Sequence, residues 1–398
     1  MNTKINQIGK WVVCAAFFML HASLFTSCIE EFEADIPDEG SDLLVVEGTI
    51  CASRMNTFVL SRTQPVNSSA ALRMVTGAKV SVRGTDGSEY VAEAASGYYA
   101  CWVDALAPDV DYYLHIETGG EVYESEPQKP LPTEKVAEVR GVQNTPESAI
   151  DVLVTPADPF EPDRANYYSW TYDETWEVHA AYTTIMYFDV ETQMRIFNNY
   201  LFPECGWRDA TSSSIMVGGS VNYEGQHIRG LKIYDIPSDD ARVYYRYSGL
   251  IHQRAITKAE YEYELARRQA GSEMGGLFTP QPSSLPTNIR CLTSAKHVIG
   301  YVGCSLNVSE YRFFLNADDF SVRRPVREDS RIWLDNCNED DCTRMVKQGL
   351  YLCEWDDKRI SFGPLRTAWA KEEQLDVRYQ DAYIEEPEFW SLTENVSY

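Results

Sequence analysis

Residues 97–103 read GYYACWV and residues 111–117 read DYYLHIE, and these two stretches decide the fold. Both are rich in the aromatic and β-branched residues that suit strands. Neither keeps the spacing of about 3.6 residues that marks an amphipathic helix. Short strands separated by turn residues predict a small antiparallel β-sandwich.

Similar stretches continue on both sides of this pair. Turn residues lie at Thr85-Asp86-Gly87 and at Gly119-Gly120, and prolines at 127, 130 and 132 mark a linker. We therefore place a first domain at residues 42–130. Its further predicted strands are 43–50 (LLVVEGTI), 56–62 (NTFVLSR), 78–83 (AKVSVR), 88–93 and 121–124.

A second, larger region is predicted at residues 131–370. Its aromatic stretch 166–187 does not alternate strictly, which favours a strand partly buried on both faces. One helix is expected at about 257–270, because Thr257 and Glu260 fit a capping box and Gly271 suits a helix end. An acidic, aromatic tail follows at 371–398. The predicted class is thus mainly β, with one helix.

Residues 1–27 are typical of a secretory signal. Lys4 and Lys10 precede an apolar run of about 15 residues, which is too short for a membrane-spanning helix. Residues 24–28 (LFTSC) resemble a bacterial lipobox, which implies cleavage before Cys28 and a membrane anchor of acyl chains on its thiol. The alternative is an ordinary cleaved signal with Cys28 free or disulfide-bonded.

Residues 28–41 form the expected lipidated tether, and IEEFEAD at 29–35 is acidic. This patch resembles the surface-export signal of Bacteroidota lipoproteins, so we expect an outer-membrane, cell-surface protein. The alternative is a solvated tether without a sorting role. The precursor has 35 basic and 60 acidic residues, and the signal carries two of the basic ones, which leaves a mature net charge of −27. Such charge excludes nucleic acid as a partner and opposes adsorption to anionic lipid.

Ten cysteines occur, of which Cys14 leaves with the signal and Cys28 takes the lipid. The remaining even number in an exported chain favours disulfides. Cys51 with Cys101 is the simplest pair in the first domain, and the pairing of the others stays open. The possible disulfide cysteines are Cys51, Cys101, Cys205, Cys291, Cys304, Cys337, Cys342 and Cys353.

Two family resemblances follow from these residues. GAKVSV at 77–82, with DG and GYY after it, is similar to transthyretin-like or carboxypeptidase-regulatory-like domains, an immunoglobulin-like sandwich. A second set of motifs comprises CGW at 205–207, residues 244–281 with their helix and GGLFTPQ block, NIRC at 288–291, VIGYV at 298–302 and PEFW at 387–390. Together they resemble a family of Bacteroidota outer-membrane lipoproteins. Its domain is described only as of unknown function, and its members are often encoded beside TonB-dependent receptors. The resemblance implies location and a receptor partner but no catalytic residues. Unlike its members, this chain has a long insert with Cys353 between Cys342 and Pro387.

The sequence lacks motifs for nucleotides, zinc proteases and nucleophilic serine. The scattered His115, His179, His227, His252 and His297 are expected to be hydrogen-bonded strand residues. DNCNEDDC at 335–342 offers oxygen ligands for calcium, but we favour a solvated loop closed by a Cys337–Cys342 disulfide. Glu174 and Glu177 beside aromatic residues are compatible with sugar cleavage, but strand packing explains them better. We expect no metal and no cofactor.

The favoured function is a non-catalytic accessory or ligand-binding partner of a TonB-dependent receptor, with an unknown ligand. A structural or adhesive surface module is the alternative. A glycan or peptide hydrolase has the weakest support, because fold class alone does not define a chemistry.

Overall fold

Strands are the main secondary structure of this computed structural model, which describes residues 42–64, 72–160, 166–198, 201–212, 215–272, 285–356, 365–392 and 394–397. Leu43–Tyr398 form one compact unit by their contacts. The signal, Cys28 and the acidic tether lie outside the described residues. Within the described residues, no helix has both the length and the apolar character needed to cross a membrane. The mainly-β prediction is confirmed.

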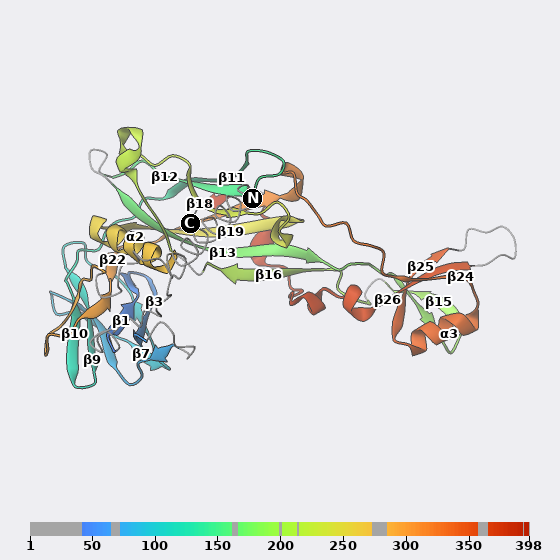
Figure 1. Ribbon diagram of the computed structural model, residues 1–398, viewed down its shortest axis with the longest axis horizontal. Helices are drawn as coiled ribbons and strands as arrows, with labels where there is room; N and C mark the ends of the chain where they lie inside the picture. Colours follow the sequence, from blue (N-terminus) through green and yellow to red (C-terminus); the bar gives the residue numbers. More distant parts are fainter. Residues whose placement is uncertain are drawn as a thin grey trace, which may run out of the picture. The chain divides into compact units, whose positions relative to one another are not determined.

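The first sandwich consists of two sheets, antiparallel except for one parallel pair, that face each other (Figure 1) and enclose one apolar core. One sheet has the order β21-β1-β3-β8-β7, with β4 paired to β3, and the other has the order β20-β10-β9-β5-β6. Their strands are β1 (Leu44–Glu47), β3 (Arg54–Arg62), β4 (Arg73–Met74), β5 (Lys79–Gly84), β6 (Glu89–Val91), β7 (Glu93–Ala95), β8 (Tyr98–Val103), β9 (Tyr112–Thr118), β10 (Glu121–Ser125), β20 (Ile289–Cys291) and β21 (Val298–Gly300).

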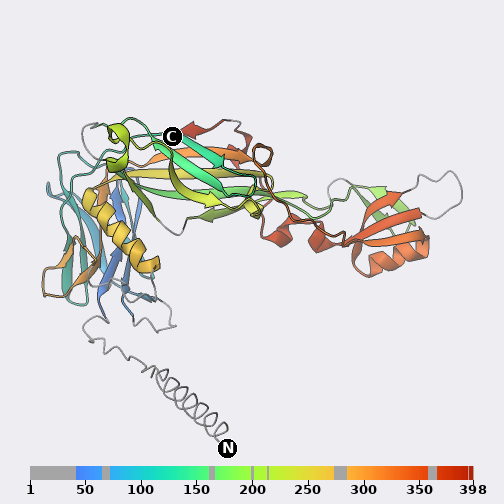
Figure 2. The same cartoon turned by 45° about the horizontal axis from the view of Figure 1, so that its top comes forward.

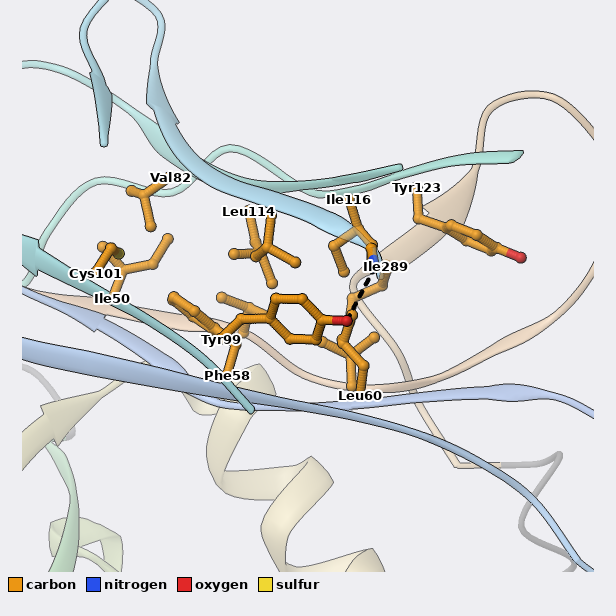
Figure 3. Close-up of a cluster of buried hydrophobic side chains, with 14 of the residues drawn as sticks. Ile50, Phe58, Leu60, Val82, Tyr99, Cys101, Leu114, Ile116, Tyr123 and Ile289 are labelled. Atoms are coloured by element: carbon orange, nitrogen blue, oxygen red, sulfur yellow. Dashed lines mark hydrogen bonds between the residues drawn. The ribbon is translucent and has the colours of Figure 1, made fainter. Parts of the chain in front are cut away.

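Alternation along β8 explains how this core forms. Tyr99, Cys101 and Val103 are buried while Tyr98 and Trp102 are exposed, as expected where successive side chains point to opposite faces. Figure 3 shows Tyr99 between the two sheets, where its hydroxyl accepts a hydrogen bond from the backbone N–H of residue 78 at 3.0 Å. That bond satisfies a polar atom inside an otherwise apolar core.

Strands from far along the chain complete the first sandwich. Residues 289–305 were expected to belong to the second region, 131–370. In the structure, β20 pairs with β10, β21 pairs in parallel with β1, and β22 (Gly303–Ser305) pairs in parallel with β2 (Thr49–Cys51). The chain therefore returns to the first sandwich after building much of the second.

The second sandwich packs a six-stranded sheet on a three-stranded one. The larger has the order β16-β13-β19-β23-β27, with β17 paired to β13, and the smaller has the order β11-β12-β18. Val152, Trp170, Ile251 and Phe313 join the core between them. The strands are β11 (Val136–Gln143), β12 (Ile150–Pro156), β13 (Tyr167–His179), β16 (Cys205–Thr211), β17 (Met216–Gly219), β18 (Leu231–Ile236), β19 (Arg246–Ile256), β23 (Ser309–Asn316) and β27 (Val396–Ser397), with short 3-10 helices η2 (Ser220–Asn222), η3 (Glu224–Gln226), η4 (Ala241–Val243) and η6 (Ala317–Asp319).

The predicted helix is confirmed as α2 (Lys258–Ser272). Thr257 accepts the Glu260 N–H at 3.1 Å, which is half of the expected capping box. The buried Glu260 carboxylate accepts a hydrogen bond from the half-buried Arg254 instead. Tyr263 packs with Val45 of β1 and Ile299 of β21, and α2 lies beside the blue strands in Figure 2. The helix therefore covers the outer face of the first sandwich.

A small module, defined by β14 (Met186–Asp189), β15 (Met194–Phe197), β24 (Ile332–Cys337), α3 (Glu339–Lys347), β25 (Leu350–Asp356) and β26 (Leu365–Lys371), has its own core (Figure 1). Phe188, Met345, Leu352 and Trp369 are buried in it. One helix was expected from the sequence, and α3 is a second one within the described residues. It begins at the acidic stretch that was taken for a loop, because Asn338 forms a capping box with Asp341.

The C-terminal tail is ordered against the second sandwich. It carries η7 (Glu372–Gln374), η8 (Val377–Gln380) and η9 (Glu388–Ser391), and β27 pairs with β23. Trp207 of β16 and Tyr383 of the tail exchange two backbone hydrogen bonds of 2.8 and 2.9 Å. A Cβ on Gly206 would lie 2.6 Å from the Tyr383 carbonyl oxygen, so only glycine permits this approach.

Candidate functional site

The strongest concentration of chemically useful side chains lies on the outer face of the second sandwich. Glu177 and His179 are two residues apart on β13, so they share a face. In the register with β16, His179 stands opposite Cys205 and Glu177 stands opposite Trp207. One carboxylate oxygen, one imidazole nitrogen and the Cys205 Sγ lie within 4.8 Å of one another. Strand register alone brings these three donor types together.

Contacts around His179 fix its ring. Its Nε2 hydrogen-bonds to the Glu177 carboxylate, and its ring stacks on Tyr245 with centroids 3.8 Å apart. The Gln380 side chain from the tail donates to the His179 carbonyl oxygen at 3.0 Å. The His179 side chain is 36% exposed and that of Glu177 is 20% exposed. The cluster is therefore held in place and yet remains accessible to a small solute.

Electrostatics make Cys205 a poor nucleophile. Burial, together with the Glu177 and Glu386 carboxylates, raises the pKa of the Cys205 thiol to about 12. A reactive cysteine needs the opposite shift, towards the thiolate at neutral pH. Glu177 also hydrogen-bonds to both partners, so it stands between the thiol and the imidazole. The raised pKa argues against covalent catalysis by Cys205, whereas the set of oxygen, nitrogen and sulfur donors is one that zinc and related metal ions accept.

Two neighbours of the cluster complete its surroundings. Arg246 donates to the carbonyl oxygens of Trp390 and Leu392, and burial lowers its pKa while the Glu177 and Glu386 carboxylates oppose that shift. Trp207 is 7% exposed, and its Nε1 has no hydrogen-bond partner among the described residues. The tail thus covers one side of the cluster and leaves a buried donor beside it.

A pocket of about 600 Å³ lies in the small module. Its lining mixes aromatic, cationic and polar side chains, and Arg195 lies 5.4 Å from the centroid of the Trp355 ring. The volume falls in the range of about 300–1,000 Å³ that is typical of small-molecule sites. Its lining residues are Phe188, Gln193, Arg195, Trp355 and the start of α3 with Cys337 and Cys342.

The two carboxylates considered for sugar cleavage do not converge. Glu174 and Glu177 are three residues apart on β13 and so point to opposite faces of the sheet. Glu174 is buried, with Arg242 Nη1 at 2.7 Å and the Tyr247 hydroxyl at 2.9 Å. The pair cannot flank one substrate, and Glu174 has a structural role.

None of the expected disulfides is found, because all eight cysteines of the described residues are free thiols. Asn56, in register with Cys101, bonds the backbone N–H and carbonyl of Cys51 and closes the turn without a cross-link. The Cys337 and Cys342 sulfur atoms lie 3.1 Å apart, beyond the S–S bond of about 2.05 Å. Cys205, Cys291, Cys304 and Cys353 are likewise unpaired in disulfides.

The acidic stretch that was weighed as a calcium loop and expected to be a solvated loop begins the helix α3. Asp341 caps α3 and pairs with Arg344 at 2.7 Å, and Arg366 pairs with Asp335 at 3.4 Å. Acidic residues at a helix start are stabilised by the helix dipole. These carboxylates therefore have structural partners.

Sequence reasoning missed the cluster of Glu177, His179 and Cys205. His115 and His252 are hydrogen-bonded strand residues, as expected, bonded to Glu124 at 2.8 Å and to Asp173 at 2.9 Å. For His179 the available signal was Glu-x-His within one predicted strand. Cys205 lies 26 residues further on, and only the pairing of β13 with β16 brings it near.

These features define a mainly-β protein of two sandwiches and a small mixed module. Residues 29–311 match the family described as a domain of unknown function (DUF4249), and the chain belongs to that family. This confirms the resemblance to a family whose domain is of unknown function. Comparison with curated proteins gives no match.

Two solved structures are similar over about half of this chain. One is a DUF4785 family protein from Legionella pneumophila, at 11% identity over 53% of this chain and 52% of that chain, with a TM-score of 0.15. The other is a segment of two fibronectin type-III domains from chicken tenascin, at 14% identity over 53% of this chain and 91% of that chain, with a TM-score of 0.14. The match therefore spans about half the length of the Legionella protein.

Proposed function

We propose that this chain is a lipid-anchored protein of the outer membrane, exposed at the cell surface, that serves as a non-catalytic accessory or ligand-binding partner of a TonB-dependent receptor. The observation that carries the proposal is the pattern of residues 1–28, in which a short apolar run ends at LFTSC. Acyl chains on Cys28 supply the membrane contact, because the mature chain is too acidic to adsorb to anionic lipid.

The folded body supports a binding role. The pocket of about 600 Å³ in the small module offers a place for a ligand. Met194 and Phe197 on the neighbouring β15 are more than half exposed, which leaves apolar surface for a partner.

The partner is tested by pull-down from detergent-solubilised outer membranes with the tagged mature protein as bait. We expect a large β-barrel receptor to be recovered with the wild-type chain. The double variant R195A/W355A removes the cation–π contact that lines the pocket. If this variant no longer recovers the receptor, the association depends on the ligand in the pocket, and if recovery is unchanged, the two proteins dock directly. Recovery of no β-barrel under several growth conditions would contradict the proposal.

The anchor is tested separately. Cys28→Ala removes the thiol that takes the lipid, so the protein should appear in the soluble fraction while its melting temperature stays unchanged. Cys353→Ser serves as the matched control, because it removes a cysteine far from the signal and should leave the membrane fraction unaltered. A Cys28→Ala protein that stays membrane-bound would exclude the lipid anchor.

A further inference from the structure

We propose that Glu177, His179 and Cys205 bind one zinc ion on the outer face of the second sandwich. This inference is independent of the anchor and of the receptor. It concerns the side chains of two paired strands, β13 and β16, whose register places the three donors on one face. The following observations carry it.

The geometry fits a compact metal centre. A tetrahedral zinc ion bonds nitrogen and oxygen at about 2.0–2.2 Å and sulfur at about 2.3 Å, which separates its ligand atoms by roughly 3–4 Å. The three donor atoms already lie within 4.8 Å of one another. Side-chain movements that bring the donor atoms about 1 Å closer together are therefore enough to form the centre. The hydrogen bond between His179 and Glu177 already aligns the imidazole and the carboxylate.

The donor set selects the metal. Calcium and magnesium take oxygen ligands, whereas a thiolate with an imidazole favours zinc and related transition metals. On binding, the Cys205 thiol gives up its proton to solvent and its sulfur forms the bond to zinc. His179 bonds the metal through Nε2 as a neutral imidazole, so the proton that Nε2 holds in its hydrogen bond to Glu177 passes to Nδ1 through solvent. Three protein ligands leave a fourth position for water.

Charge around the cluster favours a divalent cation. Glu177 supplies one negative charge within the centre, and the thiolate supplies another once zinc is bound. The exposed Glu386 is near enough to act on Cys205 electrostatically. The Arg246 guanidinium opposes this charge through its interaction with Glu177, and the carbonyl oxygens of Trp390 and Leu392 hold it in place.

A separate observation points to a polar species beside the cluster. Trp207 is on the same face as Cys205, two residues further along β16, and its buried Nε1 has no hydrogen-bond partner among the described residues. Buried indole N–H groups usually find an acceptor. A water on the fourth zinc position supplies one on this face.

The experiment uses the mature protein, stripped with a chelator, and Zn²⁺ alone as the probe. Metal analysis after equilibrium dialysis should give one zinc per chain. Cys205→Ser and His179→Ala should each weaken binding by about tenfold or more, since even losing an indirect partner of a ligand costs 10–100-fold. His252→Ala and Cys353→Ser are the matched controls, because they remove a histidine and a half-buried cysteine outside the cluster, and they should bind zinc like the wild type.

Cobalt gives a second, spectroscopic readout, which begins with the wild-type protein. Co²⁺ added to the stripped wild-type protein should produce the sulfur-to-cobalt charge-transfer band of thiolate ligation, and Cys205→Ser should lack it. Ca²⁺ and Mg²⁺ should not compete with zinc. Absence of stoichiometric zinc binding by the wild type, or a cobalt band that survives Cys205→Ser, would overturn the proposal.

Discussion

The two sandwiches follow the same architecture but differ in what they bury. Between the sheets of the first lie apolar side chains such as Phe58 and Leu114, together with Tyr99, whose hydroxyl is hydrogen-bonded. The second also buries Glu174, held by Arg242. Its outer face carries the donor cluster and is partly covered by the tail. The core of the first sandwich is therefore held mainly by apolar packing. The core of the second sandwich also contains a buried ion pair between Glu174 and Arg242.

The largest effect is expected from the core of the first sandwich. Phe58→Ala should lower the free energy of unfolding by about 4 kcal/mol, because it removes a fully buried ring and leaves a cavity. Urea denaturation measures the loss. Trp102→Ala, an exposed position on the same sheet, should cost no more than about 0.5 kcal/mol. Equal losses for the two variants would mean that burial does not govern this sandwich.

In the second sandwich, removal of a buried charge should have the next largest effect. Glu174→Ala removes the acceptor that the Arg242 guanidinium and the Tyr247 hydroxyl share, but Asp240 and Tyr234 remain as their partners, so we expect a loss of about 2–3 kcal/mol. Glu138→Ala on β11 is exposed and should be close to neutral. If Glu174→Ala were as mild as Glu138→Ala in urea denaturation, the charge network would not distinguish the second sandwich from the first.

A smaller effect compares two tyrosine hydroxyls. Tyr99→Phe leaves the N–H of Ala78 and the carbonyl of Val75 unpaired in the first core, which should cost about 2 kcal/mol. Tyr383→Phe removes one hydrogen bond to Asp209 at the surface of the second sandwich and should cost less than about 1 kcal/mol. Thermal melting of both variants beside the wild type tests this order, which a larger loss for Tyr383→Phe would reverse.

Local patterns predicted most of the first sandwich but not its last strands. The alternation around Tyr99 and the turn at Gly119-Gly120 are visible in the sequence because strand faces and turns depend on neighbouring residues. The pairing of β21 with β1 joins Val298 to Leu44, and no local pattern encodes so distant a contact. Similarly, the acids before Cys342 resembled a ligand loop, although with Asn338 they begin a helix.

The donor cluster was out of reach for the same reason. Glu177 and His179 share a face once residues 167–179 are a strand, which the aromatic pattern indicates. Cys205 joins them only because β16 pairs with β13 in one register, and a shift by one residue would turn its side chain to the opposite face. The register between β13 and β16 depends on packing across the whole sheet and on the tail, whose Tyr383 lies against Gly206.

The smallest expected effect concerns acid. Hydrogen bonds from Arg378 hold the pKa of Asp376, in the tail of the second sandwich, below its ordinary value of 3.8. A carboxyl whose pKa is lower when folded stabilises the fold fully above pH 3.8 and loses that contribution as pH falls below 3.8 towards the folded value. Asp376→Asn should therefore reduce the free energy of unfolding at neutral pH by less than about 1 kcal/mol, since Arg378 is largely exposed, and should make that free energy depend less on pH in acid.

The comparison in the first sandwich is Asp86, whose pKa is lowered by hydrogen bonds from Ser88. Asp86→Asn should change the pH dependence of the free energy of unfolding less, because Asp86 is exposed to water. Urea denaturation at a series of pH values measures both slopes, and a steeper acid dependence for Asp376→Asn than for the wild type would show that the sign of this linkage is wrong.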